Sequence, residues 1–457
     1  MYSDPEVLFY DLPEDILRAK LAGDFARMET LLNARLSSPR VSPMMKERLE
    51  FEKFRLSRLL KRYPYDRAGA MERMRARVPD FTEEELDKME EDGCVDYIYC
   101  LGGKRYVSSF SGTLIKMSDD LARREVKAPQ EDDGVDLDAF IRDIKKTGSA
   151  AYRFGIRSSL TIEKEAFEPG STYTVHIPVP AACAQQPEGE IRILPEGEAV
   201  VSDPHAFQRT VCFKRQSALN RPFEAEFSYT SRLKFVDPFR DEKHIVYPGA
   251  LPPCEDDLCE QLPHICFTPY IRRLAKYIAG DEKRPLYLAK RVYDYVTMNV
   301  RYSFMRSYLL IDRQAEYAAL NLKGDCGIQA VLFITLCRVL GIPARWQSGL
   351  TVDKFSTGDH DWAQFFTEEF GWLFADPSFG GSAFRQGKAE KHAYYFGNLD
   401  CFRMVANRRY FSEFDPPKRF IRFDPCDSQD GEAETDARGL DSFEFDKTDK
   451  TFMFEKL

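Results

Sequence analysis

The sequence predicts an α+β protein of several domains: a helical unit with a β-hairpin wing, an antiparallel β-sandwich and a mixed α+β core. Three observations predict this fold class. The chain has 457 residues, more than one hydrophobic core usually organises. Apolar residues recur at helical spacing near the N-terminus, and at every second position within residues 152–238. A long apolar segment, residues 327–340, is bounded by glycines and followed by strand-like segments.

Composition narrows the functional classes. The chain carries 65 basic and 74 acidic residues and a net charge of -9, without a basic block, so we expect no nucleic-acid partner. The N-terminus lacks the features of a signal peptide, and no uncharged apolar stretch of about 18 residues occurs, so we expect no membrane span and no membrane partner. The eleven cysteines form no regular framework, which favours a reducing compartment; we expect a cytoplasmic protein.

Residues 1–117 are predicted to form a helical domain with a small β wing. Helical spacing is clear in residues 16–32 and 50–62, and Thr82 followed by Glu85 is a capping-box signature. Alternating residues after Gly93 and a Gly102-Gly103 turn predict a hairpin. No chemistry is evident in this domain, so we interpret it as a scaffold or as a module that docks a protein partner.

Residues 118–150 are predicted to be a connector with one helix near Leu137–Lys146, and residues 151–245 a β-sandwich. His176 lies in one of its strands without a titratable partner nearby, which favours a packed or surface side chain.

Residues 246–283 form a second predicted connector. It contains Cys254, Cys259, His264 and Cys266, residue types that zinc prefers. The spacing matches none of the tight zinc knuckles, so ordinary reduced cysteines are the better interpretation, although metal binding stays open. We predict no metal site and no cofactor.

The predicted core covers residues 284–400, and residues 401–457 are expected to be a β-rich C-terminal extension. Within the core, Cys326 begins the apolar helix that ends at Gly341 and Pro343. A cysteine at a helix N-terminus has its thiolate favoured by the free N–H groups and the helix dipole. Cys337, in the middle of the same helix, is expected to be core.

His360 lies between the predicted strands 345–352 and 362–367, and Asp376 ends the next predicted strand, 372–376. Adjacent antiparallel strands can place these two side chains together, so that Asp376 orients His360 as the base for a Cys326 nucleophile. Asp359 and Asp361 flank His360, but strand alternation is expected to point them away from it, which makes them weaker candidates.

These segments resemble the transglutaminase-like superfamily, which has a papain-like core. The resemblance rests on Gly324-Asp325-Cys326, Gly341–Arg345, His360-Asp361-Trp362 and Gly371–Pro377, and covers roughly residues 285–400. The accompanying β-rich region is similar to that of bacterial members.

The resemblance implies acyl transfer from an amide through a thioacyl intermediate, with Cys326, His360 and Asp376 as the catalytic triad. The substrate would be a peptide or protein. A cysteine peptidase or amidase is favoured, because no calcium loop of the EF-hand type is present. A glutamine transamidase and a non-catalytic binding module remain as alternatives. Trp346, Tyr302 and Tyr308 are candidates for lining the cleft, and Trp346 also for donating to an oxyanion.

Overall fold

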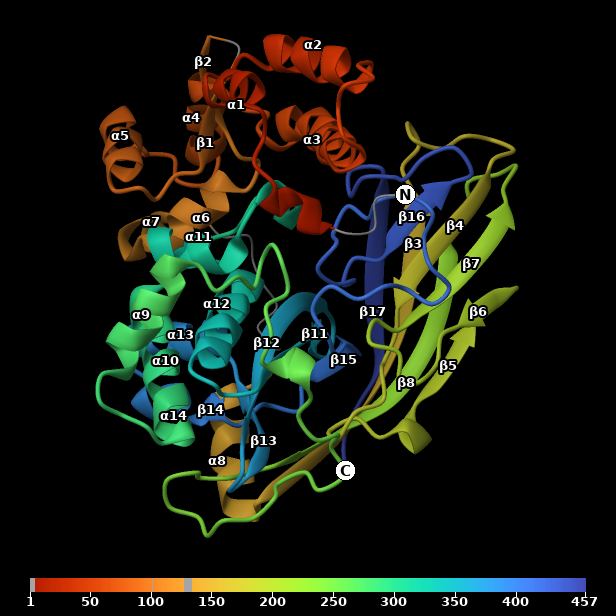
Figure 1. The fold of residues 1–457 in the computed structure, drawn as a ribbon. Coiled ribbons are helices and arrows are strands. Elements are labelled where there is room, and N and C mark those ends of the chain that lie inside the picture. The colour runs from red at the N-terminus through yellow and green to blue at the C-terminus, as the bar shows by residue number, and fades with distance from the viewer. Residues whose placement is uncertain (1–4, 101, 127–133) are drawn as a thin grey trace.

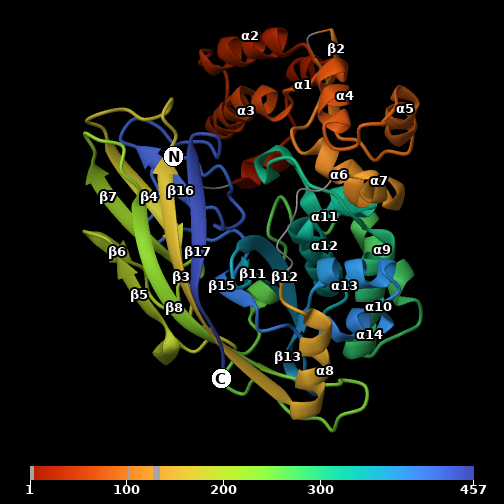
Figure 2. The ribbon, with the colours of Figure 1, turned by 180° about the vertical axis from the view of Figure 1, so that it is seen from behind.

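The computed structural model describes residues 5–100, 102–126 and 134–457, which form three units packed against one another (Figure 1). A helical N-terminal unit lies above a mixed core, and a two-sheet β unit lies beside that core. Seen from behind in Figure 2, the central sheet of the core again lies between core helices and the β unit. None of the helices in the described ranges has the length and apolar character needed to cross a membrane.

The N-terminal unit is helical, as predicted, and it includes the predicted hairpin. Its elements are η1 (Pro5–Phe9), α1 (Glu14–Leu21), α2 (Phe25–Leu36), α3 (Pro43–Arg62), α4 (Arg67–Arg75), α5 (Glu83–Glu91), β1 (Tyr97–Cys100), β2 (Gly103–Tyr106), α6 (Phe110–Met117) and α7 (Asp119–Arg124). Thr82 and Glu85 form the predicted capping box, in which each side chain accepts a hydrogen bond from the other's backbone N–H. The unit has apolar clusters of its own, and an Arg55–Asp312 ion pair of 2.6 Å joins it to the core.

The β unit consists of two four-stranded antiparallel sheets, in the orders β17-β3-β8-β5 and β16-β4-β7-β6. Its elements are β3 (Ser149–Ile162), β4 (Thr172–Pro178), η2 (Glu188–Glu190), β5 (Arg192–Pro195), β6 (Ala199–Val201), β7 (Thr210–Gln216), β8 (Phe223–Lys234), β16 (Glu432–Thr435) and β17 (Phe445–Lys456). Alternate residues of β8 are buried, and Phe223 meets Phe213 of the other sheet with ring centroids 5.8 Å apart. This arrangement is the predicted β-sandwich.

The core is built around α12 (Cys326–Val339), which is buried from Cys326 to Arg338. Its other elements are η3 (Glu255–Asp257), α9 (Pro269–Ala279), α10 (Pro285–Asn299), β9 (Arg301–Tyr302), η4 (Tyr308–Leu310), α11 (Gln314–Asn321), β10 (Lys323–Gly324), β11 (Ala344–Val352), β12 (Thr357–Thr367), β13 (Gly371–Ala375), α13 (Pro377–Arg385), α14 (Ala389–Tyr394), β14 (Phe396–Gly397) and β15 (Arg403–Asn407). The central sheet has the order β14-β13-β12-β11-β15. Phe333 of α12 packs edge-on against Phe365 of β12 at 5.9 Å, so α12 lies on one face of this sheet.

The structure differs from the predicted division of the chain at residues 401–457. These residues are not a separate extension, because β15 pairs with β11 of the core whereas β16 and β17 complete the two sandwich sheets. Local alternation marks a segment as strand-prone but does not say which distant strand it will pair with. The sandwich therefore joins residues from both sides of the core in the sequence.

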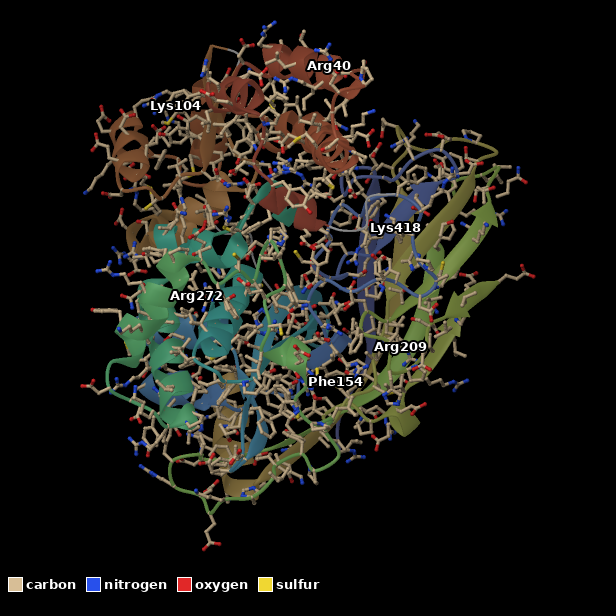
Figure 3. All side chains as sticks on the ribbon, in the orientation of Figure 1. Arg40, Lys104, Phe154, Arg209, Arg272 and Lys418 are labelled. Carbon is tan, nitrogen blue, oxygen red and sulfur yellow. The ribbon has the colours of Figure 1, made fainter. Side chains whose placement is uncertain are left out.

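The first predicted connector contains the expected helix, α8 (Leu137–Thr147), and its residues 127–133 lie outside the described ranges. Phe154 of β3, labelled in Figure 3, lies where the sandwich meets the core. Its ring packs edge-on against Phe454 of β17 at 5.3 Å and Phe402 at 6.5 Å, just before β15. The core and the sandwich thus share one continuous hydrophobic interior.

Candidate functional site

Cys326 is the first residue of α12, as predicted. Asp325 caps the helix: its Oδ1 accepts hydrogen bonds from the Ile328 N–H at 3.1 Å and from the Tyr308 hydroxyl at 2.6 Å. These contacts hold the helix start in place, because the N–H groups of a first turn need acceptors outside the helix. Only 9 % of Cys326 is exposed, so the sulfur lies at the positive end of the helix dipole in a nearly closed site.

His360 of β12 and Asp376, which follows β13, are brought together by the pairing of these two strands. His360 Nε2 lies 2.8 Å from Asp376 Oδ2. Asp376 also caps α13, since its Oδ1 accepts from the Phe379 N–H at 2.8 Å. Arg403 of β15 places Nη2 3.1 Å from the same Oδ2 and 2.7 Å from Asp400 Oδ2. Strand pairing, a helix start and an arginine therefore fix the carboxylate from three directions.

Burial and charge set the protonation states of this pair. Burial alone would raise the pKa of Asp376, but the charges of His360 and Arg403 outweigh it and hold that pKa below its usual range. Burial lowers the pKa of His360 even though Asp376 opposes the shift. A carboxylate beside a neutral imidazole results. Because Nε2 is directed to Asp376, Nδ1 is the ring nitrogen left to accept a proton.

The thiol of Cys326 has a partner that the sequence interpretation set aside: it donates a hydrogen bond to Asp361 Oδ2 at 3.2 Å. In the described ranges it makes no hydrogen bond with His360. Consecutive residues of a strand point to opposite faces, and Asp361 shares the face of Phe365, on which α12 packs. Asp361 therefore faces away from His360, as strand alternation predicts, and the thiol lies on the Asp361 side.

Further acidic and polar groups from the C-terminal segment surround this contact. Gln429 Nε2 donates to Asp361 Oδ1 at 2.7 Å and to the His360 carbonyl at 3.0 Å. Burial, and next the neighbouring Asp427, raise the pKa of Asp361 well above its ordinary value. Burial, then Asp361 and Asp325, raise the pKa of the Cys326 thiol. The thiol is therefore protonated at neutral pH in this arrangement.

The three residues predicted to line the cleft lie in different parts of the structure. Tyr308 lies at the helix start, where its hydroxyl donates to Asp325. Tyr302 pairs with Gly324 in the β9–β10 register, and burial followed by the charge of Cys326 raises its pKa. Trp346 is 1 % exposed, packs against Tyr410 with centroids 5.1 Å apart and lines a separate cavity at the other end of α12. Only the two tyrosines lie close to Cys326.

Within residues 254–266, the cysteine and histidine side chains contact different partners. Cys254 Sγ lies 3.5 Å from Asp257 Oδ2, and His264 packs between the rings of Tyr410 and Phe411. Burial lowers the pKa of His264 to about 3, so its imidazole is neutral. Within the part of the chain that the structure describes, no group of three or more His, Cys, Asp or Glu residues is arranged to hold a metal ion.

Asp361, Arg403 and Gln429 are the site residues that the sequence interpretation missed. Asp361 left a signal, because a carboxylate within a predicted strand needs a partner when it is buried. Arg403 and Gln429 left none, since they lie 77 and 103 positions beyond Cys326 and reach the site only through β15 and the segment that follows it.

Comparison with protein families finds a match over the part of the chain that contains Cys326, His360 and Asp376. Comparison with curated proteins found no match. A chain from Cytophaga hutchinsonii, provisionally assigned as a cysteine protease, has 14% identity and a TM-score of 0.39, and covers 68% of this chain and 90% of its own. The periplasmic domain of TgpA from Pseudomonas aeruginosa has 15% identity and a TM-score of 0.27, with coverages of 58% and 99%. Residues 272–377, which include α12, β11, β12, β13 and Asp376, match the model of the transglutaminase-like superfamily, and this part of the chain is a transglutaminase-like domain.

Proposed function

We propose that this protein is a thiol enzyme that cleaves or transfers the acyl group of an amide through a thioester on Cys326. Hydrolysis of peptide or isopeptide bonds is the favoured reaction. The observation that carries the proposal is the His360–Asp376 pair, in which Nε2 and Oδ2 lie 2.8 Å apart. His360 is next in sequence to Asp361, which accepts the hydrogen bond of the Cys326 thiol at the start of α12. The match of residues 272–377 to the transglutaminase-like superfamily supports the same reaction class.

In the proposed reaction, the sulfur of Cys326 attacks the amide carbonyl and its proton passes to Nδ1 of His360. The imidazolium, stabilised by the Asp376 carboxylate, then returns this proton to the nitrogen of the leaving amine as the C–N bond breaks. A water molecule or a second amine attacks the thioester, and its proton passes through His360 back to the sulfur. The N–H groups at the start of α12 point toward the region where the oxyanion would form.

The structure adds a requirement to this mechanism. The thiol donates a hydrogen bond to Asp361, and burial and the acidic surroundings disfavour the thiolate. Attack therefore requires the sulfur to leave Asp361 and come within reach of His360, whose side chain lies next to Asp361 in sequence but on the opposite face of β12. We propose that the described arrangement is the resting form and that substrate binding displaces Gln429, which donates to Asp361 Oδ1 at 2.7 Å.

The test is substrate turnover by the Cys326→Ala variant. We expect Cys326→Ala to lower amide cleavage at least about 1000-fold, because removing the nucleophile leaves only binding and positioning. Cys337→Ala is the matched control, since Cys337 is fully buried in the middle of the same helix and should leave turnover per folded molecule unchanged. Acid quenching during turnover, followed by mass spectrometry, should find the acyl group on the peptide that contains Cys326. Turnover retained by Cys326→Ala would rule the proposal out.

The acceptor is tested with a fluorescent primary amine supplied together with a glutamine-containing protein. Release of the free acid without amine incorporation indicates hydrolysis, the reaction we favour, whereas incorporation that depends on Cys326 indicates a transamidase.

A second candidate function is a non-catalytic peptide-binding module. The observation that favours it is the protonated thiol held by Asp361 beneath Gln429. This candidate predicts that peptides bind with equal affinity to the wild type and to Cys326→Ala, and that no acyl group is trapped on either.

We also propose a cytoplasmic location. All eleven cysteines are free, including pairs close in sequence such as Cys94 and Cys100. Free thiols on this scale suit a reducing compartment. Cell fractionation with a thiol-labelling step would show whether the cysteines remain reduced in the cell.

A further inference from the structure

A cavity of about 1150 Å³ lies between the β-sandwich and the core, away from the site described above. Its wall includes the end of α12 at Arg338, the start of β11, residues 408–410 and the segment 246–257. Cys326, His360 and Asp376 are not part of this wall. Cys326 and Arg338 belong to the same helix, and the rise per residue separates them by roughly 18 Å. The cavity is thus a second site.

Arginines dominate the charge of this wall. Arg338, Arg345 and Arg408 all line the cavity, and none forms an ion pair within the described ranges. Burial lowers the pKa of Arg338 and of Arg345 to about 10, and lowers that of Arg408. A buried cation without a counter-ion is costly, because the protein interior does not replace the water that the charge has lost. Arg338 is buried and Arg345 and Arg408 are half-buried, so three guanidinium groups without ion-pair partners on one wall favour the binding of an anion.

The individual contacts show that donor capacity remains. Arg345 Nε donates to Gln364 Oε1 at 2.8 Å, but its terminal nitrogens have no hydrogen-bond partner in the described part of the chain. Arg408 donates to the His205 carbonyl, while its buried Nε has no hydrogen-bond partner among the residues that the structure describes. Arg338 is used more fully, since it donates to the Ala344 carbonyl at 2.9 Å and to other acceptors. Arg345 and Arg408 are therefore the guanidinium groups available to a ligand.

The carboxylates of the wall do not neutralise these arginines. Asp256 is paired with Arg409, and Glu188 lies 3.2 Å from His205. Asp257 remains, but its Oδ2 accepts from the Cys254 N–H at 3.0 Å and forms no ion pair within the described ranges. One carboxylate against three guanidinium groups leaves an excess of positive charge.

A neutral donor on the wall is also unused. Trp346 is 1 % exposed, and its Nε1, an obligatory donor, has no hydrogen-bond partner in the structure. Much of the remaining wall is apolar or aromatic and includes Tyr247, Leu251 and Tyr410. Cavities with a few polar groups in an apolar lining are typical of small-molecule sites.

We propose that this cavity binds an organic anion, with its carboxylate or phosphate oxygens on Arg345, Arg408 and the indole N–H of Trp346, and its apolar body against Tyr247 and Tyr410. The proposal is independent of the acyl-transfer function, because no residue of the Cys326 site takes part. Arginine suits this role because its forked donors match the oxygens of carboxylate and phosphate groups.

The test is isothermal titration calorimetry of the full chain with three probes of similar shape: 1-naphthoate, 1-naphthyl phosphate and the neutral 1-naphthamide. We expect one or both anions to bind at least about tenfold more tightly than the amide. The tighter anion identifies the oxyanion that the site prefers. Arg345→Gln and Arg408→Gln should each weaken anion binding by roughly tenfold to a hundredfold, the loss expected for a hydrogen bond to a charged group. Arg40→Gln, on the N-terminal unit (labelled in Figure 3), is the matched control and should bind like the wild type.

Circular dichroism and thermal melting establish that each variant is folded, and Arg408→Gln suffices if Arg345→Gln does not fold. Equal affinity for naphthamide and both anions, no binding of either anion, or unchanged anion binding by the folded arginine variants would each overturn the proposal. Turnover of Cys326 is not part of the readout, so failure here leaves the acyl-transfer proposal unaffected.

Discussion

At its N-terminal end α12 meets the carboxyl groups of Asp325 and Asp361, and at its C-terminal end it carries Arg338 on the wall of a cavity lined by Arg345 and Arg408. Both ends complement the helix dipole, which favours negative charge at the first turn and positive charge at the last. The consequences differ. At the first turn the carboxylates compete with the thiolate for the positive end of the dipole, and the thiol stays protonated. At the last turn, Arg338 forms no ion pair with any residue that the structure describes.

The two ends of α12 show that the effect of a charge at a helix end depends on the groups that pair with it. The acidic end is internally satisfied, since Tyr308, Gln429 and the helix N–H groups all donate to its carboxylates. The basic end is not, because Arg345 and Arg408 keep donor groups that no described residue accepts from. Four variants test the comparison, from the largest expected effect to the smallest.

Arg403→Gln should have the largest effect on stability. Arg403 is 2 % exposed and is the cation that pairs with both Asp376 and Asp400. Removing one partner of a buried ion pair leaves the other charge unpaired and typically costs about 3–5 kcal/mol. Urea unfolding of the variant measures this cost, and Arg403→Lys should recover part of it. An effect below about 1 kcal/mol would show that the buried carboxylates of Asp376 and Asp400 do not depend on this arginine.

Asp325→Asn should change how stability depends on pH. Burial raises the pKa of Asp325 from 3.8 to about 6, so between these pH values the folded protein holds a proton that the unfolded chain releases. The stabilisation is complete at low pH and is lost as pH rises through 6. Ionising the buried group therefore costs up to about 3 kcal/mol at pH 8.

Asparagine keeps the acceptor for the Ile328 N–H but does not ionise. The variant should be more stable than the wild type at pH 8 and close to it at pH 4, as measured by urea unfolding at both values. The same difference at the two pH values would contradict the assignment of a buried, titrating Asp325.

Asp361→Asn should make the thiol more reactive. Burial, and next the carboxylate 3.2 Å from Cys326, raise the pKa of the thiol, so losing the charge of Asp361 should lower that pKa and increase the thiolate fraction at pH 8. The measurement is the rate at which iodoacetamide labels Cys326, followed by mass spectrometry. Cys337 provides the internal reference, since it should label equally slowly in both proteins. Slower labelling of Cys326 in the variant would mean that Asp361 activates the thiol as its base.

Arg408→Gln should have the smallest effect. In the absence of a ligand, Arg408 gains little from its carbonyl contacts and loses hydration, so its replacement should change the free energy of unfolding by less than about 1 kcal/mol. The contrast with Arg403→Gln is the test of the comparison. Strong destabilisation would show that Arg408 supports the fold as Arg403 does.

Much of the fold was predictable because its signals are local. The capping box of Thr82, the hairpin at Gly103, the sandwich strands and the helix that begins at Cys326 all follow from residue types within a few positions. The position of residues 401–457 in the fold could not be predicted, because β15, β16 and β17 pair with strands more than 50 positions away. The possible metal ligands in residues 254–266 are also close together in the sequence. Their sequence spacing does not reveal that His264 packs against the rings of Tyr410 and Phe411, because that contact depends on the tertiary structure.

The sequence by itself determined that Cys326 starts a buried helix and that His360 and Asp376 lie on neighbouring strands, because helix caps and strand periodicity are encoded by nearby residues. Only the tertiary structure decided which group the thiol contacts. The face of β12 on which α12 packs directs Cys326 to Asp361, and chain segments from beyond residue 400 supply Arg403 and Gln429. The tertiary structure also decided that three arginines share one cavity, since packing of the sandwich against the core brings their segments together.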